Sequence, residues 1–343
     1  MDDTSTTRKR ARTERDKGEN VSQKEVKRDE TIWFPDGNII LQAGGVVFRV
    51  YQGLLSLHSE VFAGLFSVPQ PQTVDTFDGH PIVCLPDNAD DLRHLLRVLF
   101  VDRRFFRHDE QECVPFSTVA SLARISHKYG VKDVLDEALT RMKSCFSDRL
   151  GDWEDTVEVE GFASILRASM GTALMTYDWP DAIAAVNIAR LTETESILPI
   201  ALYMCCQLDT EDIMNGVKRK DGTVERLAPA DIMKCLDARQ TLTHDTVVFA
   251  SHMFEPVTSS ECSGPDCGTH LQELRDVDIS YGDASSACLD SWDLWLHMDP
   301  TGDFSGLCSS CQGMVWSREA EERREIWGRL PEIMGVNVQT YTR

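Results

Sequence analysis

The sequence predicts an α+β fold, with a small three-stranded sheet flanked by about five helices and a mainly helical C-terminal region. Three observations predict this arrangement. Two runs rich in apolar and β-branched residues flank two glycines, a pattern typical of a β-hairpin. Apolar residues at helical spacing then recur through most of the chain. Two cysteine pairs near the C-terminus lie in loop-like sequence rich in glycine and serine.

The hairpin is expected from Asn38–Gln42 and Val46–Val50, which flank Gly44 and Gly45. Glycine adopts the positive φ angles of a tight turn without steric cost, so the two runs can pair. Helical spacing begins soon afterwards, and Ser59 is suited to cap a short helix. The residues expected to share the inward face of that helix are Val61, Phe62, Leu65 and Phe66.

The next elements follow in a regular order. The apolar run Pro81–Leu85 is expected to form a third strand, and Pro86-Asp87-Asn88 then supplies a helix start. A further helix is expected to start at Ser117 and to end at Gly130, and another follows it as far as Phe146. The helix that follows Asn88 has an apolar stripe that consists of Leu92, Leu95, Leu96, Leu99 and Phe100.

This front part of the chain resembles the BTB/POZ domain, and in particular the BTB proteins of the fungal (basidiomycete-type) group. The segment Ile125–Leu139 resembles the pair of antiparallel helices that closes that domain. The resemblance covers about residues 30–148 and implies a BTB/POZ domain at 29–148. The residues near the N-terminus that carry it are Phe48, Val50, Leu54, Leu55, Ser59, Val61, Phe62, Leu65 and Phe66.

The resemblance implies a non-enzymatic module for protein–protein interaction, with homo- or hetero-association through the N-terminal strand and first helices. It also implies two alternatives, a substrate adaptor of a cullin-type ubiquitin ligase and a nuclear transcriptional co-regulator. The segment Val101–Glu112 lacks a clear match to the hydrophobic–x–acidic motif of cullin-binding relatives, which weakens the adaptor alternative. The residues expected near a dimer surface are Trp33, Phe34, Ile39 and Leu41, with burial in the domain's own core as the alternative.

Charge is distributed unevenly along the chain. The net charge of the 343 residues is −21. Residues 1–28 contain nine Lys/Arg and six Asp/Glu, a net +3, and the remaining residues contain 26 against 50, a net −24. The first segment is expected to be a disordered basic tail, in which Arg8–Arg12 is either a nuclear import signal or a solvated end. The acidic remainder disfavours direct binding of nucleic acid.

The location expected from the sequence is intracellular, in the nucleus, the cytoplasm or both. No run of about 18 apolar residues occurs, so no membrane span is expected. The N-terminus lacks the apolar stretch of a secretory signal. The chain contains eleven cysteines at scattered spacings, which is typical of free thiols in a reducing compartment.

Residues 149–343 are expected to form a helical C-terminal region. Trp153–Leu208 has the pattern of consecutive helices, and Asn215–Glu225 is polar and rich in glycine, which indicates a loop or boundary. Ala230–Leu242 is expected to be helical. A last charged helix is expected at Ser317–Leu330, with Ile326, Trp327 and Leu330 as its apolar anchors, and Pro331 is expected to stop or redirect it.

The cysteine pairs suggest a structural zinc site within 262–311. Cys262 and Cys267 have the spacing C-x4-C, and Cys308 and Cys311 have the spacing C-x2-C. Four thiolates from two such loops satisfy the tetrahedral geometry that zinc prefers. His270 is an alternative fourth ligand, and Cys288 is a weaker candidate. Forty residues separate the two pairs, so the insert has to fold back to bring them together.

Catalysis is not expected. The sequence contains none of the motifs H-E-x-x-H, G-x-S-x-G, G-x-x-x-x-G-K-[ST] and G-x-G-x-x-G. A zinc hydrolase built on the cysteine pairs is the weakest hypothesis, because no nucleophile, base and orienting group can be named. A site with four thiolate ligands is closed and leaves no position for a reacting water molecule.

Overall fold

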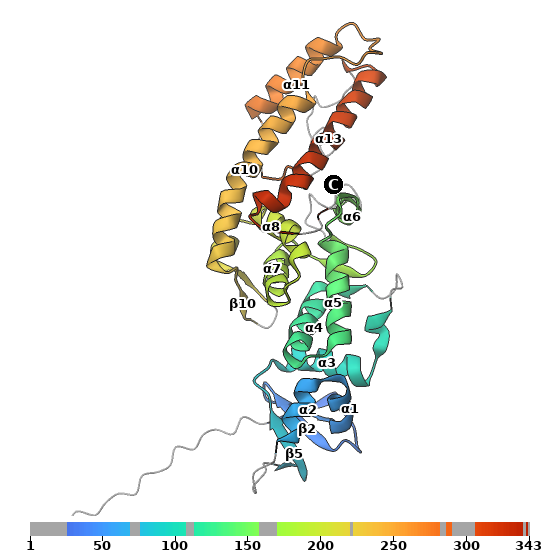
Figure 1. The fold of residues 1–343 in the computed structure, drawn as a ribbon, viewed down its shortest axis with the longest axis vertical. Helices are drawn as coiled ribbons and strands as arrows, with labels where there is room; N and C mark the ends of the chain where they lie inside the picture. The colour runs from blue at the N-terminus through green and yellow to red at the C-terminus, as the bar shows by residue number, and fades with distance from the viewer. Residues whose placement is uncertain are drawn as a thin grey trace, which may run out of the picture.

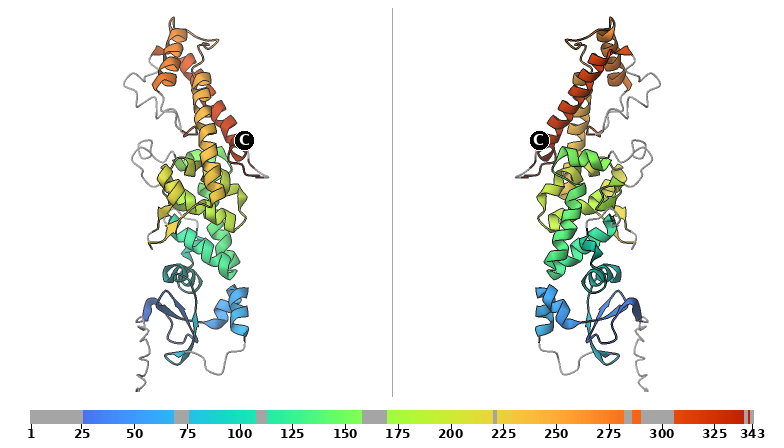
Figure 2. Two further views of the ribbon diagram at one scale, coloured as in Figure 1. Left: turned by 90° about the vertical axis from the view of Figure 1, so that its left-hand side faces the viewer. Right: turned by 90° about the vertical axis from the view of Figure 1, so that its right-hand side faces the viewer.

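The computed structural model of the chain describes residues 26–68, 76–107, 113–157, 170–219, 222–281, 286–289, 306–338 and 341. The molecule is elongated, with a β-sheet at one end, a helical body in the middle and an arm of long helices at the other end (Figures 1 and 2). Residues 1–25 of the expected disordered tail, which was placed at residues 1–28, lie outside the described residues.

A five-stranded mixed sheet forms the N-terminal end, with the strand order β1-β3-β2-β5-β4. Strands β2 and β3 are antiparallel, whereas β1 runs parallel to β3 and β5 runs parallel to β2. The predicted hairpin is therefore confirmed. Its strands are β1 (Lys27–Trp33), β2 (Ile39–Ala43), β3 (Val46–Val50), β4 (Thr76–Phe77) and β5 (His80–Cys84).

The prediction of three strands was too low, because β1 and β4 also join the sheet. Lys27 and Arg28, which were assigned to the basic tail, are the first residues of β1. Only Asp29 and Ile32 of this strand are buried, so the strand lacks the alternation of apolar and polar residues by which a strand is predicted. At the predicted turn, Gly44 and Gly45 have φ values of 54° and 83°, as a tight hairpin requires.

Five helices accompany the sheet. The cap of α2 is confirmed, because the Ser59 side chain accepts a hydrogen bond from Phe62 N at 3.0 Å. Its hydroxyl also donates to the backbone oxygen of Tyr129, which ties α2 to the end of α4. The helices are α1 (Gln52–His58), α2 (Glu60–Ser67), α3 (Ala89–Phe100), α4 (Phe116–Tyr129) and α5 (Lys132–Cys145).

The expected inward face of α2 was partly wrong. Phe62 is fully buried and stacks on Tyr129 with ring centroids 4.4 Å apart. Val61 and Leu65 are instead 46% and 38% exposed, and Leu54 on α1 is 37% exposed. Only a narrow face of α2 packs against the rest of the domain, so the residues next to Phe62 face outwards. The expected Ser117 cap is also wrong, because Pro115 occupies the N-cap of α4.

The helical body follows the front part. Trp153–Leu208 is not entirely helical, because β7 and β8 pair with β6 to form a small sheet. Residues 158–169 of this stretch lie outside the described residues. The front part also contains η1 (Arg103–Phe106) and β6 (Val114–Pro115). The elements of the body are α6 (Leu150–Val157), β7 (Met170–Gly171), β8 (Met175–Tyr177), α7 (Asp181–Leu191), η2 (Glu195–Ile197), α8 (Leu198–Cys206) and α9 (Thr210–Asn215).

The expected loop Asn215–Glu225 contains the end of α9 and a two-stranded hairpin of β9 (Val217–Lys218) and β10 (Val224–Glu225). All nine residues of α8 are buried. This helix packs against α7, α10 (Pro229–Met253) and α13 (Ser309–Ile333), so it lies at the centre of the body. One connected core runs from Ile32 in the sheet to Met334 after the last helix.

The arm consists of α10 (Pro229–Met253), α11 (Cys267–Tyr281) and α13 (Ser309–Ile333). The anchors expected on the last helix are confirmed, because Ile326, Trp327 and Leu330 are at most 3% exposed. Pro331, expected to stop or redirect this helix, lies within its final turn. Proline lacks an N–H, so the helix loses one hydrogen bond at this position, and it ends two residues later at Ile333.

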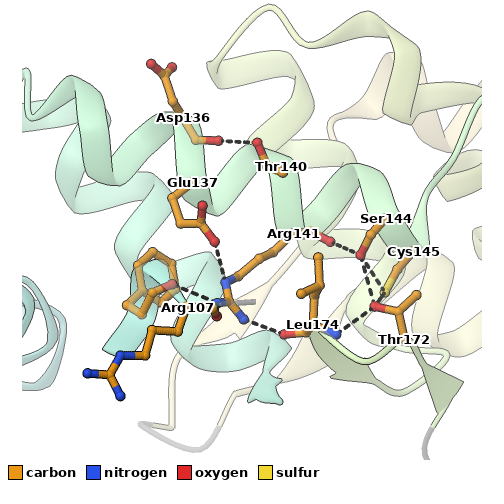
Figure 3. A network of polar contacts seen from close by, with 10 residues as sticks. Arg107, Asp136, Glu137, Thr140, Arg141, Ser144, Cys145, Thr172 and Leu174 are labelled. Carbon is orange, nitrogen blue, oxygen red and sulfur yellow. Dashed lines mark hydrogen bonds and ion pairs between the residues drawn. The ribbon is translucent and has the colours of Figure 1, made fainter. Parts of the chain in front are cut away.

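A buried arginine joins the front part to the body. Arg141 on α5 is fully buried, and its guanidinium bonds Glu137 at 2.8 Å within the same helix. The guanidinium also donates to the backbone oxygens of Phe105 at 2.7 Å, Arg107 at 2.8 Å and Leu174 at 2.6 Å (Figure 3). Phe105 belongs to η1 and Arg107 directly follows it, whereas Leu174 lies in the turn before β8. One side chain therefore connects three segments.

A partly buried ion pair between Arg93 and Asp29 fixes β1 on α3. The carboxylate of Asp29 accepts hydrogen bonds from Arg93 Nε at 2.6 Å and from the backbone N–H groups of Thr31 and Ile32, both at 2.9 Å. Burial alone raises the pKa of Asp29, but the hydrogen bonds from Arg93, Ile32 and Thr31 outweigh it and lower the pKa from 3.8 to about 2.

We predict that Asp29→Asn lowers the free energy of unfolding by about 2 kcal/mol at neutral pH. Because the pKa of Asp29 is lower in the folded than in the unfolded chain, its stabilisation is present above about pH 4 and is lost as the pH falls towards 2. Urea unfolding of the wild-type protein and of Asp29→Asn should show that the difference between their free energies of unfolding narrows as the pH falls from about 4 to about 2. Glu30→Gln, at a side chain that is 84% exposed, is the control. A gap that stays constant with pH would contradict this assignment.

Candidate metal centre

Four cysteines from the two predicted pairs lie together at the far end of the arm. Their Sγ atoms all lie within 4.8 Å of one another. Cys262 is in the loop after α10, and Cys267 is the first residue of α11. Cys308 is the N-cap of α13, and Cys311 lies in its first turn. The antiparallel course of α10 and α13 thus brings the two pairs together at the end farthest from the sheet (Figure 1).

The spacing of the sulfur atoms suits a tetrahedral metal site. A metal–sulfur distance of about 2.3 Å places two ligands of a tetrahedron about 3.8 Å apart. The Sγ atoms of Cys262 and Cys308 are 3.9 Å apart. The four cysteines can therefore hold a metal ion with little rearrangement.

The loop around the cluster requires glycine at one position. A Cβ atom added at Gly264 would lie 2.6 Å from the Sγ of Cys267, closer than atoms can approach. The backbone N–H of Cys308 donates to the same Sγ at 3.3 Å. Backbone donors aimed at a cysteine sulfur stabilise its thiolate form, which is the form that binds metal.

An arginine on α13 fixes the chain that leads to the cluster. The Arg318 guanidinium donates to the backbone oxygens of Met253 at 3.3 Å, Glu255 at 3.0 Å and Val257 at 3.0 Å. These oxygens lie at the end of α10 and just beyond it, where a helix leaves carbonyl groups without partners. Arg318 therefore sets the direction in which the chain approaches Cys262.

The electrostatics differ between the cysteines. Backbone N–H groups of Ser263 and Cys311 lower the pKa of Cys308 to about 5. Burial raises the pKa of Cys311 to about 12. A bound cation favours the charged form of every coordinating thiol, so metal binding would release protons from the buried member.

The two alternative ligands lie apart from the group of four. His270 on α11 has its ring against Gly306, and its Nδ1 lies 3.5 Å from Glu273 Oε2. The Nε2 of His270 is buried and forms no hydrogen bond within the described residues. Cys288 is buried next to Leu289, whose N–H donates to the hydroxyl of Tyr203 on α8. Among the described residues, only the four cysteines form such a cluster.

The residues expected near a docking surface pack within the chain. Ile39 and Leu41 on β2 are 3% and 0% exposed, so the structure favours the core alternative for both. Trp33 and Phe34 are half-buried, and their rings contact other aromatic rings of the same chain. These four residues therefore do not form an open surface in the single chain.

Sequence reasoning missed a different apolar surface, on α1 and α2. Leu57 is 76% exposed, the largest value among the exposed large apolar residues of the described chain. A signal was present, because residues 52–67 contain Glu60 as their one Asp, Glu, Lys or Arg. The exposed residues, which we call the α1–α2 surface, are Leu54, Leu57, Val61, Leu65 and Val68.

A cavity of about 540 Å³ lies between α3, α4, α7 and the β9–β10 hairpin. Its charged groups pair with one another. Arg124 lies 2.9 Å from the Glu225 carboxylate, and Arg219 lies 3.9 Å from Glu225 and 4.0 Å from Asp91. These pairs connect the β9–β10 hairpin of the body to α3 and α4 of the front part. They indicate a structural contact between body and front part more than a ligand site.

Comparisons with known proteins found no match, either to a family model or to a curated protein sequence. Within the described residues, no helix combines the length and the apolar character needed to cross a membrane.

We predict that Gly264→Ala weakens metal binding by at least about tenfold, because the added methyl group displaces the Cys267 sulfur. Gly268→Ala is the matched control, since its Cβ would meet only Thr258 at an ordinary 3.8 Å. Titration with Co²⁺, followed by the absorbance of cobalt–thiolate bonds, measures both affinities. Equal affinities in the two variants would show that the cluster in this geometry does not bind the metal.

Proposed function

We propose that this protein is a non-enzymatic interaction module of the BTB/POZ type that associates with itself through the α1–α2 surface. The element order supports the proposal. A hairpin is followed by two short helices, then by β5, which runs parallel to β2 of the hairpin, and then by three longer helices, in the expected sequence. The sequence resemblance over about residues 30–148 supports it independently.

The α1–α2 surface is the observation that carries the proposal. Four large apolar side chains on two short neighbouring helices, and Val68 just after the second, are between 37% and 76% exposed. Apolar residues gathered in this way, unlike single exposed ones, are characteristic of interaction sites. Burying a side chain such as Leu57 against a partner would contribute about 1.5–3 kcal/mol.

The lack of charge on the α1–α2 surface makes a second copy of the chain an acceptable partner despite the acidity of the whole chain. Two molecules that each carry a net charge of −21 repel one another unless they meet through an uncharged surface. Residues 52–67 contain one acidic residue, Glu60, and no lysine or arginine. This segment is therefore suited to self-association, and a different protein with an apolar groove is the alternative partner.

We predict that Leu57→Glu converts a dimer of the intact chain to a monomer, because it places a charge in the middle of the α1–α2 surface. Met233→Glu on α10 is the matched control, since Met233 is 64% exposed but lies on the arm. Sedimentation velocity at several concentrations measures the mass of each variant.

A wild-type chain that stays monomeric at high micromolar concentration would contradict self-association. An affinity pull-down with the same two variants then separates the alternatives. A cullin recovered with Met233→Glu and lost with Leu57→Glu would assign the α1–α2 surface to a complex with another protein.

We also propose that the ion held by Cys262, Cys267, Cys308 and Cys311 is a structural zinc. Structural zinc ions are almost always bound by four ligands in a tetrahedron, and thiolates from two loops are common ligands at such sites. Four protein ligands leave no coordination position for water, so the site would stabilise the arm and perform no chemistry.

Elemental analysis of the purified chain should give one zinc per molecule. Cys311→Ser should abolish it, because this variant removes a ligand, whereas Cys288→Ser outside the cluster should retain it. Iron in place of zinc, or a protein free of metal in both variants, would overturn the assignment.

A further inference from the structure

The four cysteines of the cluster differ in their access to solvent. Cys267 and Cys311 are 1% and 0% exposed, whereas Cys262 and Cys308 are half-buried. A small reactive molecule from solvent therefore meets Cys262 and Cys308 first. Reactivity of cysteine depends on access as well as on thiolate character.

The accessible pair is also the pair positioned to form a disulfide. The Sγ atoms of Cys262 and Cys308 lie 3.9 Å apart, and a disulfide requires about 2 Å, so a shift of about 2 Å suffices. Cys262 lies in a loop and Cys308 at a helix N-cap, where small backbone shifts break few hydrogen bonds. Cys267 and Cys311 belong to α11 and α13, and a similar shift would disturb both helices.

We propose that Cys262 and Cys308 form a peroxide-sensitive pair whose oxidation releases the metal ion. This inference rests on the proposed zinc site. One thiolate attacks a hydroperoxide, so that an S–O bond forms, the O–O bond breaks and hydroxide leaves. The other thiolate then attacks the sulfenic sulfur, which forms the disulfide and expels a second hydroxide.

The electrons and ligands balance in this sequence. The two thiolates lose two electrons to the peroxide, and solvent protons convert the two hydroxides to water. The disulfide removes two of the four metal ligands. Cys267 and Cys311 alone cannot hold a tetrahedral ion against water, so the ion leaves and the end of the arm loses its cross-link.

The test uses the intact zinc-loaded chain with Cys84 and Cys113 changed to serine, because both are exposed and would react independently. The protein is treated with hydrogen peroxide in the presence of a chromogenic zinc chelator, and its disulfides are mapped by mass spectrometry without reduction. We expect the loss of one zinc per chain, one Cys262–Cys308 disulfide for each zinc lost, and recovery of zinc binding after a thiol reductant is added.

A disulfide between Cys267 and Cys311, or retention of zinc by chains that contain the Cys262–Cys308 disulfide, would overturn the proposal. The two levels of the proposal fail separately. An untreated protein without zinc would overturn the metal assignment, and disulfide mapping of that metal-free protein would still decide whether Cys262 and Cys308 are the reactive pair.

Discussion

The buried guanidinium of Arg141 is the interaction on which the arrangement of the two halves depends. A charge in the interior is stable only when nearly all of its donors have partners. Arg141 satisfies this condition by binding Glu137 on its own helix and three backbone oxygens from η1 and the turn before β8. The bond to Leu174 ties the front part to the helical body, alongside the connected core that both share, and the α1–α2 surface and the cysteine cluster lie at opposite ends (Figures 1 and 2).

The arm meets a different physical problem. Two helices of 25 residues each pack side by side, and their far ends lie well beyond the body. A long, thin pair of helices buries little apolar surface per residue at its tip, so a cross-link there contributes more than further packing. Arg318 ties α13 to the end of α10, and four thiolates around one ion would fix the loop between α10 and α11 as well.

Local chemistry explains which features could be predicted from the sequence. The turn at Gly44 and the cap at Ser59 depend on neighbouring residues only, and both were found. Four of the seven residues of β1 are charged, and this strand forms because β3 offers it a free edge. The exposure of Val61 depends on how α2 sits on α4. The spacing of the cysteine pairs was readable, whereas their meeting depends on the antiparallel packing of α10 and α13.

The most direct test of this account is the free energy of unfolding of Arg141→Met, measured by urea denaturation. Arg149→Met is the control, because Arg149 is 71% exposed and forms only a loose ion pair. Removing Arg141 leaves a buried carboxylate and three carbonyl groups without their shared donor, so a loss of about 3–5 kcal/mol is expected. The control should change by less than about 0.5 kcal/mol. Equal stability of the two variants would contradict the central role of Arg141.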